Sequence, residues 1–129
     1  MKILVLGGVG YLGSILCPYL KNKGHEVTIY DIVKDKSEDI RNLNKLIPLM
    51  ERTEAIVHLA GLPNDVMSDK SPQLTWEVNY KANEPIAKLT HDKKVIFASS
   101  CSVYGFGIGE FNESSKLNPQ TLYAKSKLL

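Results

Sequence analysis

The sequence predicts an α/β fold built on a parallel sheet. Three observations lead to this prediction: short apolar segments, amphipathic segments with helical spacing between them, and the regular alternation of the two kinds. The apolar segments cover residues 2–7, 26–32, 54–60 and 94–98. Strands of a parallel sheet are buried on both faces and read as continuous apolar runs, and helices usually connect them.

Helices are predicted over residues 11–23, about 43–50 and about 71–90, and from about residue 121. The first has apolar residues at helical spacing and ends at Gly24, a residue type favoured just past a helix. Ser71 and Pro72 indicate the start of the third helix, with Ser71 as N-cap and Pro72 in the first turn, and Pro85 predicts a bend in it. Residues 105–119, rich in Gly, Asn and Ser, indicate a loop.

The composition is that of an ordinary globular domain, with 43% hydrophobic and 23% charged residues in a chain of 129. The net charge of +2 is spread over mixed lysines and glutamates, which does not indicate a nucleic-acid partner. No apolar run reaches the length of a membrane span, and the start lacks a signal-peptide cleavage region. We therefore expect a cytoplasmic protein with no membrane partner. The cysteines and histidines show no metal-ligand spacing, so no metal is expected.

A glycine-rich turn lies between the first predicted strand and the first predicted helix. Gly7, Gly10 and Gly13 are spaced as G-x-x-G-x-x-G. In this setting the spacing predicts a tight turn, close approach of a pyrophosphate to the backbone, and amide donors at a helix N-terminus. Asp31, at the tip of the second strand, is then placed to accept the hydroxyls of an adenosine ribose, which favours NAD. In the alternative interpretation, the glycines serve only close packing and Asp31 starts a turn.

Tyr123 and Lys127 lie four residues apart in the last predicted helix, so both side chains share one face. An ammonium beside a phenol favours the phenolate, which makes the pair a candidate general base. The same spacing also occurs on ordinary solvated helix faces. The serine-rich segment 99–105 upstream favours the catalytic interpretation.

Short motifs follow one another along nearly the whole chain. They are residues 7–13, Asp31, 39–42, 57–61, Asn79, 99–105 and the Tyr123-x-x-x-Lys127 motif. This combination resembles the extended short-chain dehydrogenase/reductase family, in its nucleotide-sugar epimerase/dehydratase branch. The resemblance implies a Rossmann-like, doubly wound parallel sheet. It also implies that residues 1–129 form a truncated NAD-binding Rossmann domain whose C-terminal substrate region is absent.

The resemblance implies cofactor contacts for the matching residues. Those implied to bind NAD are Gly7, Gly10, Tyr11, Leu12, Gly13, Asp31, Ile32, Asp39, Ile40, Leu59, Ala60, Gly61, Asn79 and Lys127. Among them, Asp31 and Ile32 would contact the adenosine ribose. Asp39 and Ile40 would flank the adenine, and Asn79 would order the helix next to the catalytic lysine.

The implied catalytic set is Ser100, Tyr123 and Lys127. Tyr123 matches the family's base, Lys127 the group that binds the nicotinamide ribose, and Ser100 the hydroxyl that hydrogen-bonds the developing ketone. The implied activity is that of an NAD-dependent epimerase-type oxidoreductase/isomerase acting on a nucleotide sugar. Many dehydratases of this branch have an acidic pair after the catalytic hydroxyl. Cys101 and Ser102 stand there in this chain, which favours epimerisation over dehydration.

The chain departs from the family pattern in two places. Residues 32–38 alone separate Asp31 from Asp39, where the family has a further helix and strand. We therefore expect four strands in the order 2-1-4-5 by family numbering, with the second strand at an exposed edge. The substrate region is also missing, so two alternatives stay open: a non-catalytic NAD-binding module or inactive remnant, and a reductase with a non-sugar substrate. A homodimer is expected only for a full-length form.

Overall fold

The computed structural model describes residues 1–128 and groups them into two compact units. The sheet unit contains Met1–Gly61 and Glu84–Ala98. The helical unit contains Leu62–Asn83 and the described part of Ser99–Leu129. The glycine turn therefore belongs to the sheet unit, and the predicted catalytic set belongs to the helical unit.

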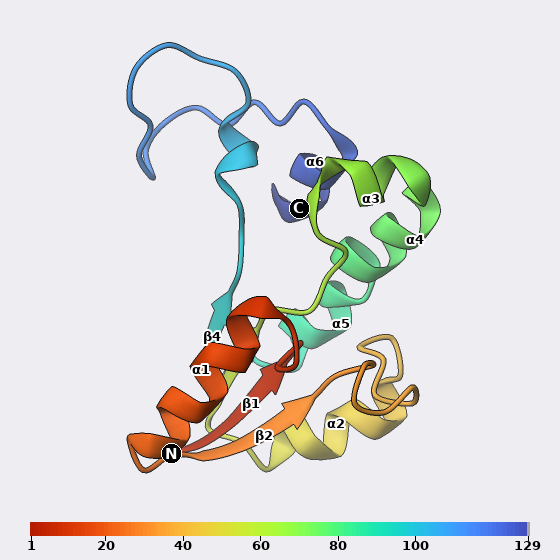
Figure 1. The fold of residues 1–129 in the computed structure, drawn as a ribbon, viewed down its shortest axis with the longest axis vertical. Coiled ribbons are helices and arrows are strands. Elements are labelled where there is room, and N and C mark those ends of the chain that lie inside the picture. Colours follow the sequence, from red (N-terminus) through yellow and green to blue (C-terminus); the bar gives the residue numbers. More distant parts are fainter. Residues whose placement is uncertain (129) are drawn as a thin grey trace. The chain divides into compact units, whose positions relative to one another are not determined.

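The sheet unit contains a four-stranded sheet in the order β2-β1-β3-β4 (Figure 1). Its strands are β1 (Lys2–Leu6), β2 (Glu26–Tyr30), β3 (Ala55–His58) and β4 (Lys94–Phe97). All three pairings are parallel. This order confirms the predicted sheet, in which the family's third strand is missing and β2 lies at an edge.

Helices on both faces bury the sheet. They are α1 (Tyr11–Asn22), α2 (Leu43–Glu51) and α5 (Asn83–Lys88), the last beginning one residue before this unit resumes. Right-handed crossovers that run in opposite directions from β1 and β2 place α1 and α2 on opposite faces. On one face, Cys17 of α1 packs with Val5 and Val57. Leu4 and Leu6 alternate to the other face and are fully buried.

A hydrogen-bonded loop over residues 31–42 stands where the resemblance led us to expect that a helix and a further strand are missing. Tyr30, at the end of β2, is fully buried, and its hydroxyl donates to the carbonyl of Asp39 at 3.0 Å. Burial raises the pKa of Tyr30 to about 12, so the phenol remains a donor at neutral pH. Lys45 of α2 binds the loop through Asp35 at 2.8 Å. These contacts anchor the shortened connection to the sheet.

The two edge strands differ in how they are protected. At β2, the Lys34 ammonium donates to the edge carbonyl of Ile29 at 3.1 Å. At β4, all four residues are exposed, and Ile96 is 66% exposed. Among the described strands, β4 pairs with β3 alone. The sheet therefore ends on an apolar strand with one open side.

The helical unit is built from short segments. They are α3 (Asn64–Lys70), α4 (Pro72–Trp76), the π-helix η1 (Glu77–Lys81), the 3₁₀-helix η2 (Cys101–Tyr104) and α6 (Leu122–Leu128). Helix α6 packs against the other four. Residues 105–119 contain no helix or strand, as predicted for a loop. None of the helices in residues 1–128 is long and apolar enough to cross a membrane.

The continuous helix predicted over residues 71–90 is divided in the structure. The amide of Ala82 donates to the carbonyl of Glu77 at 2.9 Å, five residues back, so a π-helix interrupts the α-helical pattern. The predicted capping by the Ser71 side chain is wrong, because that side chain makes no cap hydrogen bond. Ser71 also ends α3, where its amide donates to the carbonyl of Met67.

Candidate functional site

The glycine turn follows β1, and its shape requires glycine at two of the three positions. Gly7 has a φ of +79°, and a Cβ there would lie 2.6 Å from the backbone nitrogen of Ala60. A Cβ on Gly13 would lie 2.5 Å from the backbone of Gly8, so only glycine lets α1 approach the turn this closely. A Cβ on Gly10 would meet its nearest neighbour at 3.3 Å. Packing therefore constrains Gly10 less than Gly7 or Gly13.

The start of α1 has the properties that a diphosphate needs. No described side chain caps the helix at Gly10, and the first amides of a helix have no acceptor within it. The surrounding backbone is accessible, since Tyr11 is 84% and Leu12 57% exposed. Amide donors, the absence of a Cβ at Gly10 and the helix dipole together favour a bound anion. The turn therefore fits the diphosphate of a dinucleotide.

Asp31 follows β2 and binds the glycine turn. Its two carboxylate oxygens accept hydrogen bonds from the backbone amides of Val9 and Val33, each at 2.8 Å. Asp31 is 7% exposed, but each oxygen keeps a second lone pair. The carboxylate can therefore still accept the hydroxyls of a ribose. The bond from Val9 was not foreseen from the sequence, because a backbone donor leaves no signal in residue type.

The other cofactor candidates of the sheet unit differ in accessibility. Ile32 is 43% exposed beside Asp31, whereas Ile40 is 5% exposed and lies in the core. The guanidinium of Arg41 hydrogen-bonds both carboxylate oxygens of Asp39 and holds the pKa of that carboxyl below its ordinary value. Residues 59–61 follow β3, with Gly61 exposed and the other two half-buried.

Tyr123 and Lys127 lie one turn apart on α6. Both side chains are half-buried, and burial lowers the pKa of Lys127. The helix is capped by Thr121, whose hydroxyl oxygen accepts from the amide of Ala124 at 3.1 Å. The phenol and the ammonium are therefore carried by one capped, packed helix.

Ser100 lies directly before η2 and caps it. Its hydroxyl oxygen accepts from the Ser102 amide at 3.2 Å, and the hydroxyl donates to the Ser102 side chain at 3.1 Å. Because η2 packs against α6, the hydroxyl, the phenol and the ammonium belong to the same compact unit.

Asn79 lies in the π-helix η1 and is 1% exposed. Its Oδ1 accepts from the Leu62 amide at 2.8 Å, and its Nδ2 donates to the Leu62 carbonyl at 3.0 Å and to Ser126 Oγ at 3.2 Å. Ser126 in turn donates to the carbonyl of Tyr123 at 2.7 Å. Asn79 therefore holds α6 in place through Ser126. Ser126 was missed from the sequence, where its only signal is its position one residue before Lys127.

The described groups suit proton transfer and dinucleotide binding. A phenol with an ammonium one turn away can take and return a proton, and a nearby hydroxyl can stabilise a developing oxyanion. The amide-lined turn and the Asp31 carboxylate suit an adenosine diphosphate moiety. Within residues 1–128, no group of three or more His, Cys, Asp or Glu side chains could hold a metal ion.

Residues 3–129 match the model of the NAD dependent epimerase/dehydratase family. A UDP-N-acetyl-alpha-D-glucosaminuronate decarboxylase of Bacillus cytotoxicus is 34% identical over 130 residues, which cover 87% of this chain and 40% of the relative. A UDP-glucose 4-epimerase of Bacillus subtilis is 29% identical over 154 residues, which cover 100% of this chain and 45% of the relative. The chain therefore spans less than half the length of these two relatives.

A solved structure shares the fold. The UDP-glucose-4-epimerase from Stenotrophomonas maltophila, crystallised with bound NAD and formylated UDP-arabinopyranose, superposes with a TM-score of 0.88 at 27% identity. The alignment covers 99% of this chain and 46% of that one. Together with the match over residues 3–129, this shows that the chain belongs to the NAD dependent epimerase/dehydratase family.

Proposed function

We propose that this protein is an NAD-dependent nucleotide-sugar epimerase, to which the chain contributes the cofactor-binding strands and the catalytic set. The observation that carries the proposal is the placement of Tyr123 and Lys127 one turn apart on a helix that packs against the element begun by Ser100. The names of the relatives above, which contain UDP-sugars, support a nucleotide sugar as the substrate class.

The sheet unit is proposed to bind the ADP half of NAD. Backbone amides at the start of α1 hold the diphosphate, and Asp31 accepts the hydroxyls of the adenosine ribose. Ile32 and Asp39 are the further candidates near the adenosine, and residues 59–61 those near the nicotinamide half. When bound, NAD supplies a nicotinamide carbon that accepts a hydride and returns it.

The helical unit is proposed to carry out the proton transfer. Tyr123, as phenolate, removes the proton of a sugar hydroxyl while the carbon that bears it gives up a hydride and becomes a ketone. The Ser100 hydroxyl donates a hydrogen bond to the forming carbonyl oxygen, and the Lys127 ammonium favours the phenolate and binds the nicotinamide ribose. Return of the hydride to the opposite face, with the proton from Tyr123, yields the epimer and restores both groups.

Epimerisation is favoured over dehydration by the residues after Ser100. Elimination of water calls for an acid and a base beside the sugar. Cys101, which is exposed, and Ser102, which hydrogen-bonds Ser100, supply neither carboxyl group. This observation supports epimerisation and does not identify the sugar.

The test compares Tyr123→Phe with Tyr104→Phe, a control at a half-buried tyrosine of the same unit. In the protein that carries this chain, interconversion of UDP-glucose and UDP-galactose is measured with NAD present. Tyr123→Phe should lower turnover by about 10²- to 10⁴-fold and leave ADP-ribose binding unchanged. Full turnover by Tyr123→Phe would refute the assigned base. ADP-ribose binding without turnover of any UDP- or dTDP-sugar would support the non-catalytic module.

A further inference from the structure

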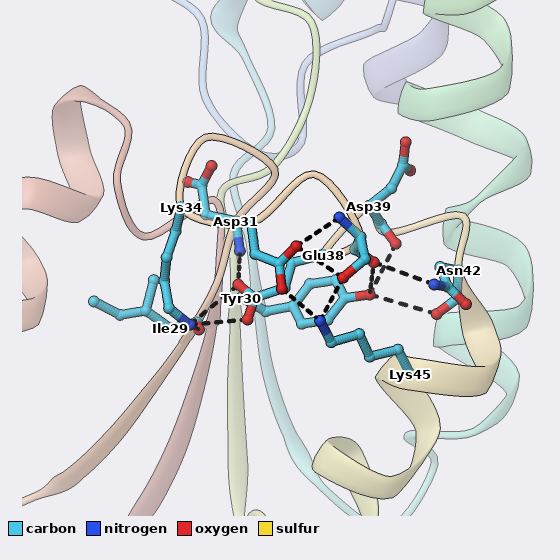
Figure 2. A network of polar contacts seen from close by, with 10 residues as sticks. Ile29, Tyr30, Asp31, Lys34, Glu38, Asp39, Asn42 and Lys45 are labelled. Carbon is cyan, nitrogen blue, oxygen red and sulfur yellow. Dashed lines mark hydrogen bonds and ion pairs between the residues drawn. The ribbon is translucent and has the colours of Figure 1, made fainter.

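Lys34 is held by the loop of residues 31–42 that follows β2. Its ammonium donates to the two carboxylate oxygens of Glu38 at 2.9 and 3.2 Å, and to the Ile29 carbonyl at 3.1 Å (Figure 2). The Lys34 amide also donates to the carbonyl of Asp31 at 3.1 Å. A cation that lies close to Asp31 in the chain is therefore bound by an acidic side chain.

Glu38 is buried against the backbone of Asp31. It is 9% exposed, and its Oε2 accepts from the Asp31 amide at 3.0 Å. A second carboxylate therefore lies next to the residue whose own carboxylate binds the glycine turn. Because Glu38 is buried, salt screens its charge less than that of an exposed carboxylate.

A 2′-phosphate on the adenosine ribose would bring a charge of about −1.5 to −2 to this place. Recognition of such a group needs cations that are free to pair with it. Lys34 is already paired with Glu38, and Lys45 is paired with Asp35 at 2.8 Å. The charge of Asp31 adds repulsion. This part of the loop therefore opposes a 2′-phosphate and accepts an unmodified ribose.

We propose that Glu38 sets the preference of this chain for NAD over NADP, by holding the Lys34 ammonium and by adding a carboxylate next to Asp31. The inference rests on the proposed dinucleotide site and deepens it. The sequence pattern identifies Asp31 alone as a residue that favours NAD. The proposal adds Glu38 and Lys34 as further determinants of this preference.

The experiment uses two probes that lack nicotinamide and differ only in the 2′-phosphate: ADP-ribose and 2′-phospho-ADP-ribose. Their dissociation constants for the full chain are measured by titration calorimetry. Glu38→Gln keeps an acceptor for the Asp31 amide but removes the charge that holds Lys34. It should raise affinity for 2′-phospho-ADP-ribose about tenfold relative to ADP-ribose, about 1.4 kcal/mol. Adding Lys34→Met to Glu38→Gln should abolish that gain.

Two control substitutions test whether the effect is specific to Glu38 and Lys34. Glu26→Gln removes an exposed carboxylate at the opposite end of β2 from Asp31, and Lys36→Met in the Glu38→Gln background removes another exposed lysine. Neither should change the ratio of the two affinities. Lys34→Met alone, at a side chain that is 51% exposed, should weaken 2′-phospho-ADP-ribose several-fold, because it leaves the Glu38 charge uncompensated. The substituted side chain is itself exposed, so this variant keeps the test open if Glu38→Gln fails to fold.

The outcomes distinguish failure of the proposed role of Glu38 from failure of the proposed dinucleotide site. If ADP-ribose binds and neither Glu38→Gln nor Lys34→Met changes the affinity ratio, the role of Glu38 is refuted and the dinucleotide site stands. If a gain in Glu38→Gln survives Lys34→Met but is lost with Lys36→Met, the assignment of Lys34 is refuted. If no folded variant binds ADP-ribose, the dinucleotide site itself is refuted, and the inference with it.

Discussion

Asn79 Nδ2 donates to Ser126 Oγ over 3.2 Å and so joins the π-helix η1 to the helix that carries Tyr123 and Lys127. Asn79 is 1% and Ser126 2% exposed, so water does not compete for this bond. The same amide binds both backbone polar groups of Leu62. One side chain therefore holds three segments of the helical unit together.

Asn79→Ala should lower the free energy of unfolding of the helical unit by about 2–4 kcal/mol, because it leaves buried groups of Leu62 and Ser126 without partners. Ser126→Ala, the milder control, should cost about 1 kcal/mol. The single tryptophan, Trp76, lies in α4 and reports on this unit. Urea unfolding followed by its fluorescence measures both effects. Equal midpoints for Asn79→Ala and the unchanged chain would mean that other contacts place α6.

Tyr30→Phe should reduce the loss of stability that the sheet unit shows at alkaline pH. Burial raises the pKa of Tyr30 to about 12, with smaller contributions from neighbouring carboxylates. The unfolded chain loses this proton near pH 10, so the stability contribution is complete below about pH 10 and is lost as the pH rises towards 12. Tyr30→Phe should be about 1 kcal/mol less stable at pH 7 and decline less above pH 10.

The measurement for Tyr30 is the urea midpoint by circular dichroism from pH 7 to 11. Tyr19→Phe is the matched control, because Tyr19 is 57% exposed. This control should decline with pH like the unchanged chain. An identical decline in Tyr30→Phe would show that another group carries the transition.

Gly10→Ala and Gly13→Ala should separate binding from folding. A Cβ on Gly13 would lie 2.5 Å from the backbone of Gly8, so Gly13→Ala should destabilise the sheet unit by about 1–3 kcal/mol. A Cβ on Gly10 would make one tight contact, 3.3 Å from the Gly7 carbonyl oxygen, so Gly10→Ala should be destabilised less than Gly13→Ala but bind ADP-ribose at least tenfold more weakly. Thermal unfolding and calorimetry give the two quantities. Unchanged ADP-ribose binding by Gly10→Ala would argue against a diphosphate at this turn.

Lys127→Met should weaken the pH dependence of the stability of the helical unit and abolish turnover. Burial lowers the pKa of Lys127, so the folded state resists protonation. The stability contribution is therefore lost as the pH falls from about 10.4 through the lowered pKa. Lys127→Met should flatten this dependence, and Lys125→Met, at an exposed position of the same helix, should not. Trp76 fluorescence in urea between pH 7 and 10 is the measurement. An unchanged pH dependence of stability in Lys127→Met would contradict the burial cost.

The sheet was predictable because its signals are local. Apolar runs predict four parallel strands, the resemblance to the family implies their order, and the structure confirms both. The form of the connection itself was not predictable. Tyr30, Glu38 and Lys45 are ordinary residues in sequence, and their hydrogen bonds appear only when residues 31–42 fold back on β2.

The helical unit was predicted less well because long-range contacts shape it. Helix α3 was missed, although Pro63 and Asn64 at its start were a usable signal; Asn64 Oδ1 accepts from the Met67 amide at 3.1 Å. The π-helix has no signature in apolar spacing, since it depends on Asn79 reaching Leu62 and Ser126. Tyr123 and Lys127 were identifiable from spacing, but Ser126 was identifiable only from its partner.

Strand β4 carries a practical consequence for the purified polypeptide. The side chains of Val95 and Ile96 are exposed, and among the described strands β4 pairs with β3 alone, which makes it a template on which a strand from another molecule can be added. Solubility will therefore be limited at this strand as concentration rises. Its length of only four residues keeps that tendency small.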